Sequence, residues 1–441
     1  MEPLSKKTVA WTVQNGLCCS CGLCKNSCPA GCIRYERKNG SFFPVIDNTR
    51  CVGCETCAEI CPGLEVCFTK AKEPLDNVYG EIRASYNAWS RSPELRHVSA
   101  SGGVVSSLVE RLLTEEEYDA AFCVNSYQYD DQLKTECVLR EKQPADWVDS
   151  TLPKSRYLPV SHENAVEYLL KNREKRVILI GNACSVQGFR KVIRKFSLHP
   201  ENYLLVGLFC DKVFNYNVKD YFQRQFAGEK RIAGIHFKNK ESGGWPGNMK
   251  LLFDDGSSAY LDKSERGRVK DYFMPERCLY CVDKLNVAAD ISVGDNYTEQ
   301  NSSPLGSNTV LIRTEQGERA WQKSCGSLYY ESVKPEALRK AQFLDGRINN
   351  LYFSLLKQRE IEKRSGCKLC INSGMMAADA PGDYEWAYKT ALEKLRSGAC
   401  YREDPEKLAR QFRLEEKRRD PRNPAVLGRR LYYGIKRRLQ G

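Results

Sequence analysis

Apolar residues recur through the middle of the chain in two alternating patterns. Short uninterrupted apolar runs at Ala120–Val124, Val177–Ile180 and Leu204–Phe209 predict buried strands. The apolar stripe of Val104–Leu113 has helical spacing, and a basic helix is expected at Gly188–Phe196. Strand, tight polar loop, helix and strand in turn are typical of an α/β domain, which binds its ligands at the carboxyl ends of its strands.

A hairpin is predicted nearer the start of the chain. Ile33–Tyr35 and Ser41–Phe43 flank Asn39 and Gly40, a dipeptide that favours a type I′ turn. The hairpin separates two segments related by a constant offset of 33 residues, which carries Pro29 onto Pro62. We interpret them as an internal duplication, each copy a short strand, a loop and a helical turn.

Cysteine is concentrated in these two copies, each of the form Cys-x-x-Cys-x-x-Cys-x-x-x-Cys-Pro. In bacterial two-cluster ferredoxins, three close cysteines of such a run bind one cubane and the fourth crosses to the other. Zinc favours paired Cys-x-x-Cys knuckles but has no use for a third cysteine two residues on. The surplus cysteines Cys19, Cys32 and Cys67 are expected to be packing thiols. The spacing predicts two [4Fe–4S] clusters, one held by Cys18, Cys21, Cys24 and Cys61, and the other by Cys51, Cys54, Cys57 and Cys28.

Four further cysteines fall within the α/β part of the sequence. Cys184 and Cys210 each follow an apolar strand, on the side where such a domain assembles its site, and Cys278 and Cys281 form one Cys-x-x-Cys. Alone, the Cys-x-x-Cys motif fits a redox dithiol, half a zinc site, or no site at all. The four thiols together would suit a third [4Fe–4S] cluster, and the residues by themselves leave these alternatives open.

The loop Ser99–Gly103 runs directly into the first apolar helix. Its cofactor candidates are Ser99, Ser101, Gly102 and Gly103, because a Ser/Gly loop at a helix N-terminus leaves backbone N–H groups free to bind phosphate. The alternative is an ordinary helix cap. His97 lies beside this loop, either touching a cofactor or serving a structural role.

The composition narrows the classes of protein. The chain has 441 residues, 21 cysteines and a formal net charge of +12. Cysteines at metal spacings and no apolar leader after Met1 favour a reducing compartment, with cytoplasmic as the expected location. No apolar run reaches the length of a membrane span. From Lys417 onwards nine Lys or Arg accompany a single acid, Asp420, so the positive charge is local and weak evidence for nucleic acid.

Three domains are expected: a two-cluster module over residues 1–75, an oxidoreductase domain over 76–345 and a helical basic extension over 346–441. After Leu311 the sequence reads as helical and polar. Cys367 and Cys370 are weak metal candidates beside the simpler account of packed or exposed thiols. The aromatic and basic tail would suit an anionic membrane surface or a protein partner, and a solvated terminal helix is the simpler alternative.

Seven motifs, in order over residues 85 to 315, resemble the family of the deazaflavin-coenzyme (F420) hydrogenase/dehydrogenase β subunit, whose members contain FAD and iron–sulfur clusters. One departure is Ala183, where the family usually has proline. The family includes the reductase of 7-hydroxymethyl chlorophyll, and a branch with a ferredoxin module in front looks typical of bacterial polysaccharide-synthesis gene neighbourhoods. The motifs are Ser99–Gly103, Lys154–Tyr157, Gly181–Cys184, Gly207–Asp211, Gly244–Trp245, Cys278–Cys281 and Ala289–Asp295.

The resemblance implies that Cys184, Cys210, Cys278 and Cys281 ligate a third cluster close to FAD. It also implies a fold class: an α+β ferredoxin-like module, then an α/β flavin/iron–sulfur domain and a helical extension. The residues that would line the FAD or its hydride partner are the Ser99–Gly103 loop together with Lys154, Arg156, Tyr157, Gly181, Asn182 and Asp295.

The function expected on this basis is a flavin- and iron–sulfur-dependent oxidoreductase whose electrons enter or leave through the N-terminal module. Its partners would be a redox protein or soluble reductant and a small-molecule or deazaflavin-type hydride acceptor or donor; homo-oligomer formation is compatible with it. The rival is a non-catalytic electron-transfer subunit that docks to a partner enzyme. A third interpretation, nucleic-acid processing, predicts salt-dependent binding and has no helicase or base-reading motif to support it.

Overall fold

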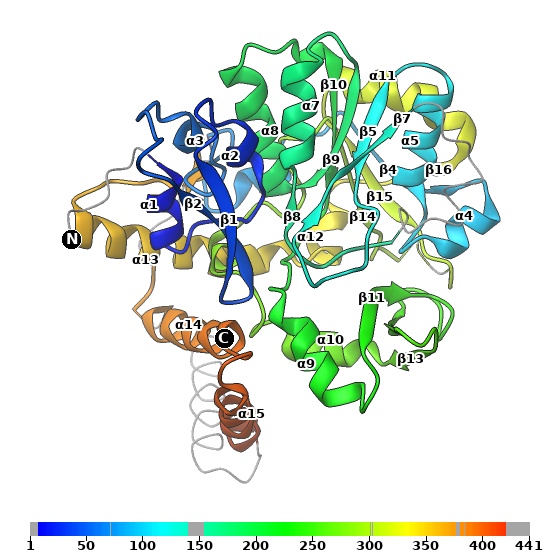
Figure 1. Ribbon diagram of the computed structural model, residues 1–441. Helices are drawn as coiled ribbons and strands as arrows, with labels where there is room; N and C mark the ends of the chain where they lie inside the picture. The colour runs from blue at the N-terminus through cyan, green and yellow to red at the C-terminus, as the bar shows by residue number, and fades with distance from the viewer. Residues whose placement is uncertain are drawn as a thin grey trace, which may run out of the picture.

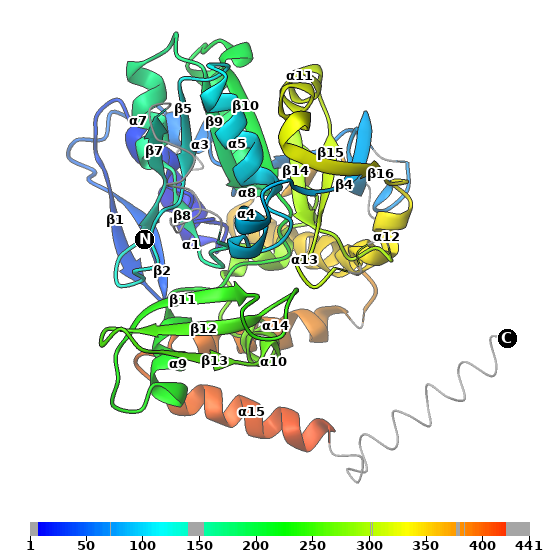
Figure 2. The same cartoon turned by 90° about the vertical axis from the view of Figure 1, so that its right-hand side faces the viewer.

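The computed structural model describes residues 8–70, 72–139, 154–299, 301, 303–375, 380–382 and 384–419. Figures 1 and 2 show a large sheet with helices on its faces, the N-terminal segment beside it, and a second layer of strands and helices below.

Among the described residues the largest sheet has eight strands, in the order β16-β4-β15-β14-β10-β9-β5-β7. β5, β9, β10 and β14 run parallel, whereas the pairs at both edges are antiparallel. The three apolar runs found in the sequence are confirmed as the parallel strands β5, β9 and β10. The bounds are β4 (Ala84–Ser90), β5 (Ala120–Cys123), β7 (Glu136–Leu139), β9 (Val177–Asn182), β10 (Tyr203–Leu208), β14 (Ile291–Asp295), β15 (Asn308–Ile312) and β16 (Leu328–Ser332).

Helices cover both faces of this sheet, because alternate strand residues point to opposite sides. Ile178 and Leu204 pack with α5 (Val104–Thr114) and α11 (Glu315–Ser324) in one core. Leu179 and Leu205 pack with α7 (Glu163–Lys171) and α8 (Ala183–Lys195) in the other. The predicted helix from Val104 is confirmed.

Two expectations from the sequence were wrong in detail. The basic helix α8 begins at Ala183 rather than Gly188, because the polar residues read as a loop form its buried first turn after the extended Asn182. The stretch after Leu311 is not only helical, since β16 forms the sheet edge against β4. The residues of β16 after Leu328 are exposed, so no alternation of apolar and polar residues marks this strand.

The N-terminal segment contains α1 (Val9–Gln14), α2 (Leu23–Asn26), β1 (Ile33–Lys38), β2 (Ser41–Ile46), α3 (Thr56–Glu59) and β3 (Val66–Cys67). The predicted hairpin is confirmed: Lys38 pairs with Ser41, and Asn39 and Gly40 both have the positive φ of a type I′ turn. The segment packs against the large sheet's helices, since Leu23 and Ile60 belong to the core that contains α8.

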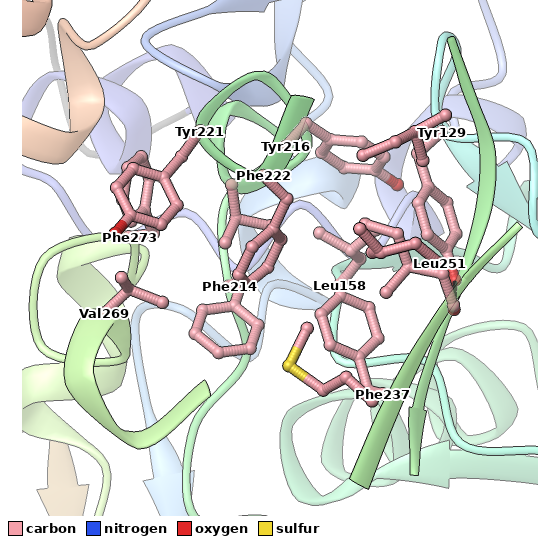
Figure 3. Close-up of a cluster of buried hydrophobic side chains, with 14 of the residues drawn as sticks. Tyr129, Leu158, Phe214, Tyr216, Tyr221, Phe222, Phe237, Leu251, Val269 and Phe273 are labelled. Atoms are coloured by element: carbon pink, nitrogen blue, oxygen red, sulfur yellow. Dashed lines mark hydrogen bonds between the residues drawn. The ribbon is translucent and has the colours of Figure 1, made fainter. Parts of the chain in front are cut away.

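The second layer consists of the antiparallel sheet β11 (Ile232–Asn239), β12 (Asn248–Phe253) and β13 (Ser258–Leu261) with α9 (Asn217–Phe226) and α10 (Lys263–Val269). Figure 3 shows its core, in which the rings of Phe214, Phe222 and Phe237 gather beside Leu251 and Tyr129. Phe214 and Phe237 stack with their ring centroids 5.4 Å apart. This core fixes β11 opposite the large sheet.

The described C-terminal residues form α12 (Ala337–Ala341), α13 (Arg347–Ser365), β17 (Asn372–Ser373), α14 (Tyr384–Ala399) and α15 (Pro405–Arg419). β17 pairs in parallel with β3, so the C-terminal part of the chain extends the N-terminal segment. No helix in the described ranges is both long and apolar enough to cross a membrane. The basic tail beyond Arg419 lies outside the described residues.

Shorter elements are α4 (Pro93–Val98), β6 (Leu133–Lys134), β8 (Val160–Ser161), and the 3-10 turns η1 (Asp76–Tyr79), η2 (Pro200–Asn202), η3 (Glu276–Tyr280), η4 (Cys325–Ser327) and η5 (Leu344–Gly346).

We expect acid to weaken the second layer through His236 of β11. Burial, and then the neighbouring bases Lys154 and Lys250, lower the pKa of His236 to about 4. In the unfolded chain His236 takes up a proton near pH 6.5, whereas in the folded chain it does so only near pH 4. The contribution of neutral His236 to the stability of the fold is therefore complete above pH 6.5 and is lost as the pH falls towards 4. The maximum loss is about 3 kcal/mol, reduced by solvent screening.

Urea unfolding of wild type and His236→Gln at pH 7 and pH 4.5 measures this effect. The variant should lose less stability than wild type over that interval. Equal losses in the two proteins would show that other groups account for the acid sensitivity.

Candidate functional site: three cysteine sets and a large cavity

The first predicted ligand set is brought together in the structure. Cys18, Cys21, Cys24 and Cys61 line one small cavity of about 20 Å³ between α1, α2 and the segment after α3. The Tyr35 hydroxyl lies 3.2 Å from the sulfur of Cys24. Burial, and then the nearby Cys61, raise the pKa of Cys18 to about 12. Four thiolates in such a place need a cationic partner, which an iron core supplies.

The second predicted set consists of Cys28, Cys51, Cys54 and Cys57, and three of these thiols share one small core with Cys24 of the first set. Burial raises the pKa of the Cys57 thiol, with Cys61, Cys28 and Cys54 adding to the shift. Cys54 is exposed. Cys32 is close to this set, with its sulfur 3.4 Å from that of Cys28. The two sets are neighbours through Cys61.

The third predicted set joins residues that are far apart in the sequence. Cys184 lies in the first turn of α8, and Cys210 follows β10. Cys278 lies within η3, and Cys281 follows it. Burial raises the pKa of Cys210, followed by the influence of Cys278, Cys184 and Cys281, so the four thiols are mutual neighbours. In the described part of the chain, no three His, Cys, Asp or Glu side chains are arranged to hold a single metal ion.

The surroundings of Arg277 show whether an iron–sulfur cluster would fit among the cysteines of the third set. Its side chain is 4% exposed, its Nε donates to the Gly63 carbonyl at 3.2 Å, and both Nη atoms are buried with no partner among the described residues. The guanidinium lies close enough to Cys184, Cys278 and Cys281 to influence their ionisation. A cubane with four thiolates is an anion of about two charges, which would pair with this buried cation. The residues therefore fit a cluster.

Cys19 connects the first and third sets. A hydrogen bond from the Cys19 thiol, together with the nearby Arg277, lowers the pKa of Cys184 to about 7 despite its burial. Cys184 also contributes to the raised pKa values of Cys18 and Cys21 of the first set. The sequence suggested only a packing role for Cys19. Its position in the first cysteine motif gives no indication that it contacts Cys184.

The third set opens onto a cavity of about 1220 Å³ at the carboxyl ends of β5, β9, β10 and β14. Gly102 does not line the cavity; it lies against Ala88 and Asn308, and its carbonyl accepts from the Ser90 N–H at 2.8 Å. Of the third set, Cys210 and Cys278 line the cavity. The sequence-predicted cofactor residues found in the lining are Ser99, Ser101, Gly103, Lys154, Arg156, Tyr157, Gly181, Asn182 and Asp295.

The lining offers two places for an anion. Gly103 is the N-cap of α5 with φ of 80°, a conformation that suits glycine, and the loop before it leads into the positive end of the helix. Arg156 is largely buried, stacks over the Tyr127 ring at 4.6 Å, and has an Nη2 atom with no partner among the described residues. The cavity thus suits an organic cofactor that carries phosphate.

Two lysines were missed by the sequence reasoning: Lys238 near the end of β11, and Lys240 directly after this strand. Lys238 forms a buried ion pair with Asp295, which outweighs burial and raises the pKa of Lys238, while the pKa of Asp295 is lowered. Lys240 donates to the carbonyls of Ser101 and Leu305, each at 2.8 Å, and so holds the Ser99–Gly103 loop. No alternation marks this inward face, because Phe237, Lys238 and Asn239 are all buried and the strand register shifts between His236 and Asn239.

Two family models match the chain, and both describe the β subunit of coenzyme F420 hydrogenase/dehydrogenase. The model for its N-terminal part matches residues 85–164, and the model for its C-terminal part matches residues 174–338. Together they span more than half of the chain. They include the third cysteine set and most of the large-cavity lining, and they exclude the first and second sets.

Individual relatives carry related names. The chain is 26% identical to a subunit of the F(420)H(2) dehydrogenase of Methanosarcina mazei, over 74% of the chain and 85% of that relative. It is 25% identical to the coenzyme F420-dependent sulfite reductase of Methanocaldococcus jannaschii over 69% of the chain, but spans only 46% of that relative. A chain of the F420-reducing [NiFe] hydrogenase complex of Methanosarcina barkeri aligns with a TM-score of 0.47 and 21% identity, covering 65% of this chain and 94% of that one.

Proposed function

The chain belongs to the family of the coenzyme F420 hydrogenase/dehydrogenase β subunit, and from that premise we propose that it is an iron–sulfur flavoprotein oxidoreductase. It passes electrons between [4Fe–4S] clusters and FAD, with hydride exchange to a soluble substrate or a deazaflavin-type coenzyme. The proposal is supported by a continuous series of neighbouring thiols. Cys61 links the second set to the first, and Cys19 links the first set to the third. Cys210 and Cys278 of the third set then line the large cavity.

The residues that would hold the cofactors are the three cysteine sets and the cavity lining. The first two sets form a ferredoxin-type module within residues 1–75, and the third lies in a flavin domain over 76–345. FAD, when bound, exchanges single electrons with iron–sulfur centres and an electron pair with an organic substrate. Arg277 would balance the charge of a cluster on the third set, and the Ser99–Gly103 loop and Arg156 would bind the phosphate of the cofactor.

The ion pair of Lys238 and Asp295 fixes charge at the inner wall of the cavity. Tyr297 donates from its hydroxyl to Asp295 at 3.3 Å, so the carboxylate is held from two sides. The pair keeps a proton on Lys238 at neutral pH. A positive side chain there would stabilise negative charge on a ring bound beside it.

Electron exchange with a protein partner is favoured by one surface feature. Val52, between Cys51 and Cys54 of the second set, is 71% exposed, and Cys54 is exposed as well. An apolar side chain beside the outermost thiols suits a small, transient docking contact. The rival function, a subunit that only relays electrons, shares this contact and differs in lacking flavin.

Anaerobic purification of the full chain, with iron, sulfide and flavin quantified per chain, tests the proposal. We expect about twelve irons from three four-iron clusters and one FAD. Clusters without flavin would contradict the enzyme and favour the electron-relay alternative. Fewer than about eight irons would contradict the ferredoxin-type module itself.

A further inference from the structure

Arg277 lies where the third cysteine set meets the N-terminal segment. It belongs to η3 and directly precedes Cys278. Its Nε donates to the carbonyl of Gly63 at 3.2 Å, and Gly63 closely follows the first-set ligand Cys61 in the chain. A Cβ on Gly63 would meet the Leu17 carbonyl oxygen at 2.2 Å, so the backbone that accepts this bond is itself tightly held. The Arg277 side chain therefore joins the third set to the segment that carries the first.

The positive charge of Arg277 has no acidic partner among the described residues. Its side chain is buried, and neither Nη atom has a hydrogen-bond partner in the described ranges. The preceding residue, Glu276, pairs instead with Lys357 at 3.0 Å. Arg347 also lies near the third set, but it forms an ion pair with Asp211. Of these three bases, Arg277 alone brings an uncompensated charge to the third set.

The surroundings of the first set differ in charge from those of the third. In the part of the chain that the structure describes, the pKa values of Cys18, Cys21 and Cys24 respond mainly to burial, neighbouring thiols and hydrogen bonds, and none of these main influences comes from a base. By contrast, Arg277 favours the thiolate form of three of the four third-set cysteines. A base that stabilises thiolates also stabilises the additional negative charge that a cluster gains on reduction.

We propose that Arg277 raises the reduction potential of a cluster on the third set above that of a cluster on the first set. The proposal rests on the proposed function, which supplies both clusters. In this step one electron leaves the reduced first-set cluster, which is oxidised, and reduces the third-set cluster, while no bond forms or breaks. The charge of Arg277 makes the transfer favourable, so electrons collect beside the large cavity, which Cys210 and Cys278 line.

A redox titration followed by EPR spectroscopy tests the proposal on the full chain, purified anaerobically with its clusters. Cys278→Ser and Cys24→Ser are each expected to lack one cluster. Subtracting their spectra from that of the wild type identifies the signals of the third and first clusters. In the wild type, the third cluster should be reduced at a higher potential than the first.

Two substitutions of Arg277 separate its charge from its hydrogen bond. Arg277→Gln retains an N–H donor for the Gly63 carbonyl but removes the charge, whereas Arg277→Lys retains the charge. At a fixed potential, we expect Arg277→Gln to lower the ratio of reduced to oxidised third cluster by about tenfold, which for one electron is a downward shift of about 59 mV. Arg277→Lys should stay close to the wild-type ratio.

Lys25→Gln is the matched control. Lys25 directly follows the first-set ligand Cys24, much as Arg277 directly precedes a third-set ligand. Lys25 pairs with Glu163 at 3.0 Å, and its side chain is 36% exposed. Its partner and the solvent screen its charge, so Lys25→Gln should leave the potential of the third cluster at the wild-type value.

The proposal is overturned by a wild-type third cluster that is reduced below the first, by an unchanged third-cluster potential in Arg277→Gln, or by equal shifts in Arg277→Gln and Arg277→Lys. If Arg277→Gln does not retain its third cluster, Arg277→Lys decides: a ratio close to wild type supports the role of the charge, and a tenfold fall contradicts it. Iron and flavin content report separately on the proposed function. A wild type without a third cluster contradicts both proposals, whereas a full complement of cofactors with an unshifted potential contradicts only this one.

Discussion

Replacing Cys278 by serine should lower the iron content from about twelve to about eight per chain, because a four-iron cubane that loses a thiolate corner is released or destabilised. Cys278 is a partly buried neighbour of Cys210 and Cys281 and lines the large cavity. The remaining irons should stay with the N-terminal thiols. Iron and acid-labile sulfide, measured on anaerobically purified protein, give the result.

Cys325→Ser is the matched control, since it removes a partly exposed thiol that belongs to none of the three sets. It should retain the wild-type iron content. Wild-type iron in Cys278→Ser would contradict the third cluster. Loss of all iron would show instead that the N-terminal clusters depend on the third set for their assembly.

Replacing Lys238 by methionine should destabilise the protein by about 3–5 kcal/mol, because it leaves the Asp295 carboxylate buried without its counter-charge. The carboxylate keeps only weaker partners, such as the Tyr297 hydroxyl. The double variant Lys238→Met/Asp295→Asn should recover much of this loss, since no uncompensated charge remains. Urea unfolding of the four proteins in a double-mutant cycle measures the coupling.

Lys250→Met provides the comparison for this prediction. Lys250 of β12 pairs with Glu241 at 2.6 Å, but the carboxylate side chain is 42% exposed, so its loss should cost about 1 kcal/mol or less. Similar losses for Lys238→Met and Lys250→Met would contradict the view that Lys238 and Asp295 form a buried, mutually dependent pair.

The predictable parts of the fold were those whose pattern is local. Val177–Ile180 and Leu204–Phe209 are buried on both faces, so each forms an uninterrupted apolar run that can only be an interior strand or helix. Asn39 and Gly40 determine a turn by their own backbone preferences. By contrast, β16 is exposed along most of its length, and its place depends on pairing with β4 far earlier in the chain.

The candidate site divides in the same way. The spacing of Cys18, Cys21 and Cys24 fixes their proximity along a few residues, and the structure brings Cys61 to them. Lys238, Arg277 and Trp386 carry no motif and come to the cavity and the cysteine sets only through long-range packing. The contact of Cys19 with Cys184 likewise depends on how the N-terminal segment packs on α8.

The pairing of β17 with β3 has a consequence for the order of assembly on the ribosome. Val66 donates to the Ile371 carbonyl at 2.9 Å and Phe68 to the Ser373 carbonyl at 2.8 Å. The segment that follows the eight predicted cysteine ligands is thus completed by residues made some three hundred positions later. These eight thiols are therefore synthesised long before the strand that pairs with β3. The backbone pairing of the N-terminal segment is complete only after residues 372 and 373 have been made.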